Sequence, residues 1–341
     1  MTKIVIDAFG GDNAPLEVIK GARLALEEFS DIKLILTGDE EKIKSCALEN
    51  KLSLEGIDIV DAKGVIPVEE DPTKILKEYR SSSMATGMEL LAKGDADAFV
   101  SGGSTGAVVV GGTFIVKRLK GIKRAAIGTV IPCKNGHYML MDAGGNAECR
   151  PEMLLQFALM SRAYMEGVLG KENPRIALVN IGAEETKGLE LQREAYKLLE
   201  KAPINFIGNA EGRDIPMGMC DIAICDGFTG NVILKLTEGL ASFFGGELKE
   251  MFMSSIFSKI GALFTSSALK NFKKKLDYKE MGGAPLLGLK KTVIKAHGSS
   301  DARAFKNAIR QARLCVISDV PFKTQEALKQ IKLEANKETE E

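Results

Sequence analysis

The sequence predicts an α/β protein in which helices cover both faces of a mostly parallel β-sheet. Short apolar runs recur along the chain, and each ends in a polar, glycine-containing turn that opens a helix-like segment. This alternation is typical of strands joined by helical crossovers. The chain has 341 residues, of which 45% are hydrophobic, so it can bury a large core. The predicted strands lie at residues 4–6, 33–36, 98–100, 138–141, 176–181, 205–207, 221–225 and 292–296.

The turn after the run at 98–100 contains only glycine, serine and threonine, and an apolar segment that suits a helix follows it. Glycines let a ligand approach the backbone, and a helix N-terminus favours negative charge. Between Asp97 and Asp142 there are six basic residues and no acidic one, which should attract anions. We therefore expect an anion site here, although a turn that only packs a helix on the sheet is the alternative. The turn consists of Ser101, Gly102, Gly103, Ser104, Thr105 and Gly106.

Polar residues also gather in the other turns. Because the carboxyl ends of parallel strands lie at one edge of a sheet, we expect all eight turns to converge on one crevice. For any single residue in these turns, a helix cap is the alternative explanation. The candidate crevice residues are Asp7, Gly10, Gly11, Asp12, Asn13, Asp142, Asn146, Lys187, Asp226, Thr229, Asn231, His297, Ser299 and Asp301.

Residues 240–276 interrupt the alternation of strands and helices, because their apolar residues recur near helical spacing with no strand signal. A basic helix with a broad apolar face suits a membrane surface or a partner's groove, and a helical dimer contact is the alternative. We expect an α/β catalytic domain at 1–239 and 286–322, a helical insertion at 240–285 and a charged tail at 323–341. The candidate contact residues of the insertion are Phe252, Ile256, Lys259, Phe264, Lys270, Lys273, Lys274 and Lys275.

Composition and missing motifs exclude several classes of protein. The 46 basic and 46 acidic residues balance, which argues against a general nucleic-acid binder. Six cysteines without a C-x-x-C pair and only two histidines argue against a zinc site of the usual spacing. There is no P-loop motif, and the turn at 101–106 lacks features of a dinucleotide fingerprint. Because we see neither a signal-like leader nor an apolar run that could span a bilayer, we expect a cytoplasmic protein.

Five of the turns closely resemble motifs of the bacterial phosphate acyltransferases, which are acyl-carrier-protein:phosphate transacylases of phospholipid synthesis. The resemblance extends from residue 1 to about residue 320, with the motifs in unbroken order. The matching segments are 7–15 (DAFGGDNAP), 101–107 (SGGSTGA), 141–146 (MDAGGN), 226–231 (DGFTGN) and 296–301 (AHGSSD).

This resemblance implies a fold like that of phosphotransacetylases and isopropylmalate dehydrogenases, a homodimer, and no metal or nucleotide cofactor. The implied reaction moves a fatty acyl group from acyl carrier protein to inorganic phosphate and gives acyl phosphate. A membrane-bound acyltransferase would then pass the acyl group to glycerol 3-phosphate. We therefore expect a cytoplasmic enzyme that associates peripherally with the inner face of the membrane.

The candidate residues suit this chemistry. Phosphate is already a nucleophile, and a thiol with a pKa near 8.5 leaves readily, so the enzyme mainly positions the reactants and stabilises an oxyanion. We assign phosphate to the turn at 101–106, with Lys187 or His297 as a second, cationic contact. Asn231 and Asn146 are candidates for holding the thioester carbonyl, and His297 is alternatively the base that deprotonates phosphate. The acidic carrier protein would dock on the basic segment 117–124 or 270–275.

Three other functions stay open at this point. A phosphotransacetylase-like enzyme would use a coenzyme A thioester in place of acyl carrier protein. A decarboxylating dehydrogenase of similar fold is disfavoured by the missing dinucleotide features. A non-catalytic, anion-binding membrane scaffold would explain the helical segment but not the eight polar turns.

Overall fold

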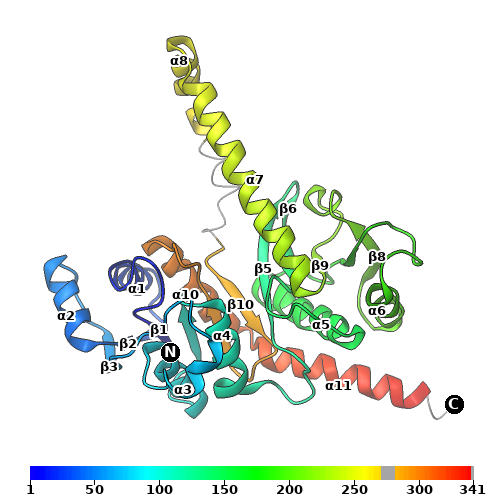
Figure 1. Ribbon diagram of the computed structural model, residues 1–341, viewed down its shortest axis with the longest axis horizontal. Coiled ribbons are helices and arrows are strands. Elements are labelled where there is room, and N and C mark those ends of the chain that lie inside the picture. The colour runs from blue at the N-terminus through cyan, green and yellow to red at the C-terminus, as the bar shows by residue number, and fades with distance from the viewer. Residues whose placement is uncertain (270–280, 339–341) are drawn as a thin grey trace.

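The computed structural model of the chain describes residues 1–269 and 281–338. In this part of the chain one sheet holds eleven strands in the order β3-β2-β1-β4-β11-β10-β5-β6-β9-β7-β8. Figure 1 shows β2 and β3 toward one side of the molecule and β8 toward the other. The strands are β1 (Thr2–Asp7), β2 (Ile32–Gly38), β3 (Ile57–Asp61), β4 (Ala98–Ser101), β5 (Ala126–Cys133), β6 (Gly136–Met141), β7 (Ile176–Asn180), β8 (Phe206–Glu211), β9 (Ile222–Ile224), β10 (Ala284–Leu287) and β11 (Thr292–Lys295).

Helices connect most of these strands, as the alternating pattern of the sequence predicts. The main helices are α1 (Leu16–Glu28), α2 (Glu40–Glu49), α3 (Ser83–Lys93), α4 (Thr105–Gly111), α5 (Pro151–Val168), α6 (Glu190–Lys201), α7 (Gly227–Met253), α8 (Ile256–Phe264), α10 (Ala302–Ile317) and α11 (Val320–Glu338). Shorter helical segments are η1 (Pro72–Leu76), η2 (Gly112–Lys117) and η3 (Ile215–Met217).

All eight predicted runs are strands, and the predicted α/β fold with a mostly parallel sheet is confirmed. Three strands were not predicted, namely β3, β5 and β10. Two of these, β5 and β10, lie side by side at the centre of the sheet and are antiparallel to each other. They escape prediction because neither strand ends in a polar turn that opens a helix, which is the signal by which the eight predicted strands were recognised.

The sheet consists of two parallel blocks that run in opposite directions. The first block contains β1–β4 and β11, and the second contains β6–β9. The direction changes because β10 is antiparallel to β11 and β5, and β5 is antiparallel to β6. The expectation that all strand ends lie at one edge is therefore wrong, since periodicity identifies a strand but not its direction.

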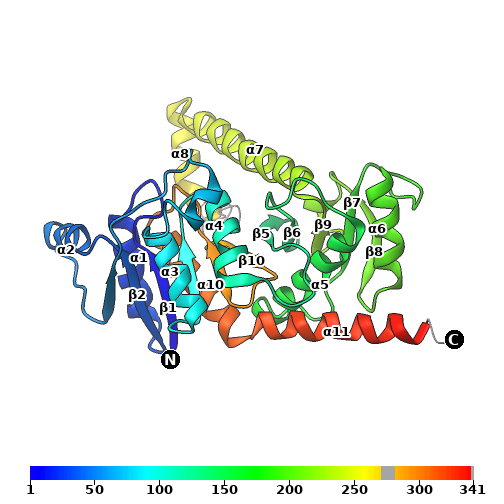
Figure 2. The same cartoon turned by 60° about the horizontal axis from the view of Figure 1, so that its bottom comes forward.

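Hydrophobic clusters cover both faces of the sheet, so most strands are buried on two sides. Successive residues of β1 show this, because Ile4 and Ile6 belong to one cluster and Val5 to the other. Helices α1, α5, α6 and α10 contribute to the first cluster, and α3 and α4 contribute to the second. Figure 2 shows the two blocks on either side of the central strands, with α11 along the bottom of the view.

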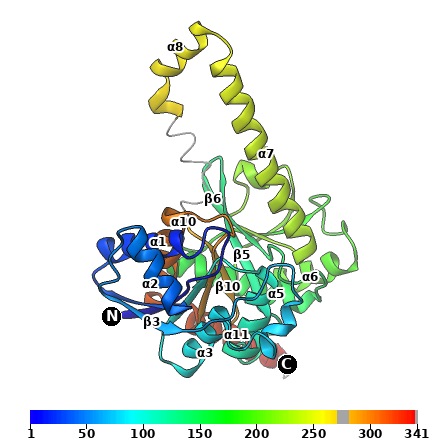
Figure 3. The same cartoon turned by 60° about the vertical axis from the view of Figure 1, so that its left-hand side comes forward.

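Helix α7 is continuous from Gly227 to Met253, so the predicted domain boundary at residue 240 lies inside a helix. Beyond the body of the protein, α7 and α8 form a projecting arm (Figure 3). Large apolar side chains on this arm are exposed, among them Ile256, Phe257 and Phe264 at 74%, 86% and 88%. Within the described residues, no helix is both long enough and apolar enough to cross a membrane. The predicted contact residues Lys270, Lys273, Lys274 and Lys275 lie outside the described residues.

The predicted charged tail at 323–341 begins inside helix α11. Three residues of this helix, Val320, Thr324 and Leu328, are buried, and the helix packs against α5. The first turns of α11 therefore belong to the core, and the boundary at residue 323 does not separate the tail from the body.

We predict that Gly230→Ala lowers the free energy of unfolding by about 1–3 kcal/mol, because an added Cβ would lie only 1.8 Å from the carbonyl oxygen of Asp142. Gly239→Ala in the same helix is the matched control, since its Cβ would meet no atom within 4 Å. That control should gain about 0.5–1 kcal/mol from helix propensity. Urea denaturation followed by circular dichroism measures both, and equal effects of the two substitutions would contradict this packing.

Candidate active site

A cavity of about 510 Å³ lies where the two blocks of the sheet meet. Strand β5 and helix α7 form two of its walls, and the first turn of α4 and the end of β11 also line it. Its apolar lining includes Ile127, Val130, Ile131, Pro132, Leu234 and Ala241, and its polar lining includes Thr105, Asn231, Lys235, Glu238, Lys295 and His297. A long apolar group and a small anion can therefore be held in the same space.

The buried carboxylate of Asp7 holds the turn after β4 in place. The hydroxyl of Ser101 donates to Oδ2 of Asp7 at 2.7 Å and accepts from the backbone N–H of Gly103 at 3.0 Å. Asp7 also accepts from Phe9 N–H at 3.2 Å and from the hydroxyl of Ser83. Complete burial raises the pKa of Asp7 despite these donors. The Ser101 hydroxyl and the Gly103 N–H thus form hydrogen bonds within the protein. Of the predicted anion-binding turn, Thr105 and Gly106 line the cavity.

The glycines of this turn allow close packing of two loops. A Cβ on Gly10 would lie 2.5 Å from the Asp7 carboxylate and 2.8 Å from Gly103 N. A Cβ on Gly102 would lie 2.7 Å from the carbonyl oxygen of Gly10. The turns after β1 and β4 therefore require glycine for contact with each other. The start of the glycine-rich turn packs two loops together and its end lines the cavity, so anion binding stays a prediction for Thr105 and Gly106.

Lys295 is the principal functional candidate that the sequence reasoning missed. It ends β11, lines the cavity and is nine-tenths buried, with Nζ donating to the carbonyl oxygens of Gly102, at 3.3 Å, and Ala296. Burial lowers the pKa of Lys295 to about 8, although the carboxylates of Asp12 and Asp7 oppose this shift. The only signal in the sequence is a single cation within an otherwise apolar strand.

His297 lies two residues after Lys295 and lines the same cavity. The backbone N–H of Ser299 donates to its Nδ1 at 3.2 Å, and the hydroxyl of Ser299 lies 2.9 Å from the same atom. Because a backbone N–H can only donate, Nδ1 accepts, and the neutral ring carries its proton on Nε2. Partial burial lowers the pKa of His297, and the neighbouring ammonium groups of Lys295 and Lys235 act in the same direction. In the neutral ring Nδ1 is therefore the acceptor atom and Nε2 the donor atom.

Helix α7 supplies the opposite side of the cavity. Asn231, Lys235 and Glu238 lie at helical spacings of four and three and line the cavity together. Lys235 Nζ lies 2.7 Å from Oε2 of Glu238, so this exposed ammonium is paired. Sequence reasoning identified Asn231 and missed the other two, although their shared helical face is visible in the sequence.

Three further predicted aspartates mainly hold the loops in place. Asp226 caps α7 by accepting from Thr229 N–H at 2.8 Å, and Asp301 caps α10 by accepting from Ala304 N–H at 2.9 Å. The hydroxyl of Thr229 also donates to Asp226. Buried Asp142 accepts from Ile127 N–H and from Asn146 Nδ2, at 3.0 and 2.7 Å.

The structure separates several residues that were expected to meet. Asn146 directs its amide hydrogens to Asp142 Oδ2 and to the carbonyl oxygen of Ala125, and it does not line the cavity. Lys187 is exposed in the turn after β7, where its carbonyl oxygen accepts from Asn180, and it does not line the cavity either. Asp12 and Asn13 are exposed, and the N–H of Asp12 donates to Gly298 O at 2.8 Å. The turns after β1, β2, β7 and β8 contribute no residue to the cavity lining.

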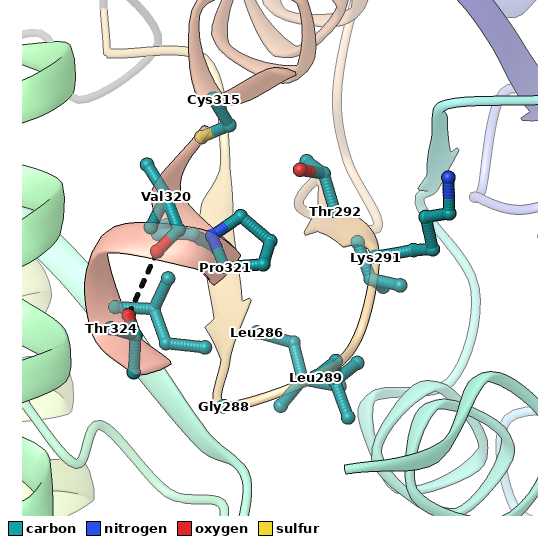
Figure 4. Close-up of a pocket in the computed structure, with 12 residues that line it drawn as sticks. Leu286, Gly288, Leu289, Lys291, Thr292, Cys315, Val320, Pro321 and Thr324 are labelled. Carbon is teal, nitrogen blue, oxygen red and sulfur yellow. Dashed lines mark hydrogen bonds between the residues drawn. The ribbon is translucent and has the colours of Figure 1, made fainter. Parts of the chain in front are cut away.

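Other hollows of the described part of the chain suit a substrate less well. A cavity of about 20 Å³ near the β10–β11 turn has room for about one water molecule, and its Thr324 hydroxyl donates to Val320 O (Figure 4). A polar cavity of about 320 Å³ contains Lys171 and Arg175, but Asp221 pairs with both cations. Among the described residues, no group of three or more potential metal ligands occurs.

Comparison with known sequences shows extensive similarity to one family. A family model described as "Fatty acid synthesis protein" matches residues 2–323. The phosphate acyltransferase of Caldanaerobacter subterraneus subsp. tengcongensis is 48% identical over 318 residues, which cover 93% of this chain and 95% of that protein. The phosphate acyltransferase of Alkaliphilus oremlandii is 49% identical over 310 residues, which cover 91% and 92% of the two chains.

Solved structures of low sequence identity share the fold. A phosphotransacetylase from Streptococcus pyogenes matches with a TM-score of 0.64 at 18% identity, covering 93% of this chain and 94% of that one. A branched-chain phosphotransacylase from Enterococcus faecalis matches with a TM-score of 0.57 at 16% identity, covering 93% and 99%. A putative 4-hydroxythreonine-4-phosphate dehydrogenase from Salmonella typhimurium matches with a TM-score of 0.53 at 13% identity, covering 92% of this chain and 98% of that one. The predicted likeness to phosphotransacetylases and dehydrogenases is confirmed at the level of fold.

Proposed function

The chain belongs to the phosphate acyltransferase family, and from this premise we propose that it transfers a fatty acyl group from acyl carrier protein to inorganic phosphate, giving acyl phosphate for phospholipid synthesis. Family membership makes the protein an acyltransferase with phosphate as acceptor. The observation that carries the finer proposal is the buried ammonium of Lys295 in a cavity with extensive apolar walls.

Phosphate binds between Lys295 and the first turn of α4 in this proposal. The ammonium has two protons directed to backbone carbonyl oxygens, so its third N–H is available to an anion. Thr105 and Gly106 belong to the first turn of a helix, where backbone N–H groups have no acceptor within the helix. This arrangement retains the predicted phosphate site at its Thr105–Gly106 end and replaces Lys187 by Lys295 as the cationic contact.

The thioester lies with its acyl chain along the apolar wall formed by β5 and α7. Val130, Ile131 and Leu234 line this part of the cavity, which has room for a chain much longer than acetyl. The phosphate oxygen attacks the thioester carbonyl, and the resulting oxyanion requires donors. We assign this role to His297 and Asn231, both of which line the cavity. Collapse of the oxyanion expels the thiolate, and we assign His297 as a donor in preference to a base.

An exposed basic loop supports an acidic carrier protein as the donor of the acyl group. Lys117, Lys120, Lys123 and Arg124 are exposed on it, and Gln156 of α5 holds it through Lys123 N–H and the carbonyl oxygen of Gly121. A cationic surface fixed in this way attracts an acidic protein with little loss of loop entropy. The other predicted docking segment, 270–275, lies outside the described residues.

The projecting arm supports peripheral contact with the inner face of the membrane and a homodimer. Residues Phe228, Val232, Leu236 and Leu240 form one exposed apolar line along α7, which suits a second copy of the chain. At the far end, exposed Phe257, Leu263 and Phe264 suit a lipid surface, with Lys259 beside them for anionic headgroups. Membrane contact would bring the lipophilic acyl phosphate close to a membrane-bound glycerol-3-phosphate acyltransferase.

We predict that phosphate drives the release of free thiol from a long-chain acyl carrier protein, with acyl phosphate as product. The assay follows thiol colorimetrically, with and without phosphate, and runs the matching acyl-coenzyme A in parallel. Release from the coenzyme A thioester alone would favour the phosphotransacetylase-like alternative. No release from either thioester would contradict the proposed function.

We predict that Lys295→Gln raises the KM for phosphate roughly 10- to 100-fold and leaves the KM for the thioester nearly unchanged, because a charge-assisted hydrogen bond contributes about 1.5–3 kcal/mol. Lys295 is charged below pH 8 and neutral above it, so kcat/KM for phosphate in the native enzyme should fall as the pH rises through about 8. Lys295→Arg is the matched control, because guanidinium stays charged and should remove that fall. An unchanged phosphate KM in the glutamine variant would refute this assignment.

We predict that replacing Phe257 and Phe264 together by serine weakens binding to phosphatidylglycerol vesicles by roughly 100-fold or more. Each ring contributes about 1.5–3 kcal/mol when it leaves water. Phe114→Ser is the control, because this phenylalanine belongs to η2, outside α7 and α8, and is 61% exposed. Vesicle flotation measures the effect, and undiminished binding of the double variant would leave the arm as a protein contact only.

A further inference from the structure

Lys295 combines two properties that rarely occur together, burial and access to a substrate cavity. Its side chain is nine-tenths buried, yet the residue lines the 510 Å³ cavity beside Thr105 and His297. Lys235, a second lysine among the described residues of the cavity lining, is more than half exposed and is paired with Glu238 at 2.7 Å. The two lysines therefore meet the same substrates in very different surroundings.

The hydrogen bonds of Lys295 fix the orientation of its nitrogen. Nζ donates to the carbonyl oxygens of Gly102 and Ala296, which are backbone atoms that cannot move away easily. A tetrahedral nitrogen then has one remaining position. In the charged form this position carries the N–H that serves phosphate, and in the neutral form it carries the lone pair. The amine is thus held ready to donate a proton or to act as a nucleophile at the same point.

Burial makes the neutral form accessible near physiological pH. The pKa of Lys295 is lowered to about 8 by desolvation. At pH 7.5 such a group is neutral in roughly a quarter of the molecules, against roughly one in a thousand for a lysine at its usual pKa of about 10.4. Buried lysines with lowered pKa values are the ones that act as nucleophiles in proteins.

We propose that Lys295 is a self-acylation site, at which the acyl phosphate formed in the cavity transfers its acyl group to Nζ. This inference rests on the proposed function, because acyl phosphate is the product of that reaction. The lone pair of the neutral amine attacks the acyl carbonyl and forms a C–N bond. The bond between that carbon and the phosphate oxygen breaks, inorganic phosphate leaves with the electron pair, and the ammonium proton of the intermediate passes to solvent. The result is a neutral amide in place of the cation.

Acylation of Lys295 would limit the enzyme through its own product. The amide has no charge for the incoming phosphate, and its acyl chain occupies the apolar wall of the cavity. Inorganic phosphate would oppose the modification in two ways, since it occupies the same position and favours the charged amine. The modification would therefore accumulate when phosphate is scarce and acyl phosphate is not removed.

The test supplies the acylating agent directly. The full-length protein is incubated with synthetic palmitoyl phosphate between pH 7 and 9, digested, and analysed by mass spectrometry for palmitoyl groups on each lysine. We expect Lys295 to be acylated at least tenfold faster than Lys235, with a rate that rises through about pH 8. Inorganic phosphate should slow acylation of Lys295 and leave that of Lys235 unchanged. Lys295→Arg should abolish labelling at this position without increasing it elsewhere.

The outcome of this test does not depend on the proposed function, because palmitoyl phosphate is added and need not be made by the enzyme. Preferential, phosphate-sensitive labelling of Lys295 supports the proposal. Labelling of Lys295 no faster than that of Lys235, or labelling that phosphate does not slow, overturns it even if the thiol-release assay succeeds. In the native protein, loss of thiol-release activity should follow the fraction of Lys295 acylated.

Discussion

The buried hydrogen bond between Ser101 and Asp7 is the interaction on which the geometry of the site depends. It joins the ends of β1 and β4. Asp7 also accepts from Ser83 at the start of α3 and from Phe9 N–H in the turn after β1, so the same carboxylate connects these segments. A carboxylate removed from water needs such donors, because each unsatisfied polar group costs about 1–3 kcal/mol or more. Gly102 comes directly after Ser101 in the chain, and its carbonyl oxygen accepts a hydrogen bond from Nζ of Lys295.

Burial affects the pKa values of the cavity side chains as much as neighbouring charged groups do. Lys295 has two carboxylates near enough to raise its pKa, yet desolvation exceeds their effect. The pKa of His297 is likewise lowered, mainly by partial burial and also by the ammonium groups of Lys295 and Lys235, although the carboxylates of Glu238 and Asp12 oppose the shift. The site therefore combines a titratable cation with an imidazole whose charged form is disfavoured. Such a pair suits an acceptor anion and a developing oxyanion better than two fixed charges would.

Helix α7 links the chemistry to the surface of the molecule. Its first turns pack on the carbonyl of Asp142 and carry Asn231, Lys235 and Glu238 into the cavity, and its later turns leave the body as an exposed apolar arm. An α-helix of 27 residues is about 40 Å long and stiff, so the two ends cannot move independently. Division of the chain into a catalytic domain and an insertion at residue 240 overlooks this continuity.

The sequence by itself determined the fold class, eight of the eleven strands of the described residues, and the family, because hydrophobic periodicity and strand-end motifs are local properties of the chain. It also identified Thr105, Gly106, Asn231 and His297, which line the cavity. Only the tertiary structure decided which turns meet, because the order and direction of the strands, which place Lys187 away from the cavity, are not local properties of the chain. It also selected Lys295, because burial and the hydrogen bonds that orient a side chain depend on contacts between residues far apart in the sequence.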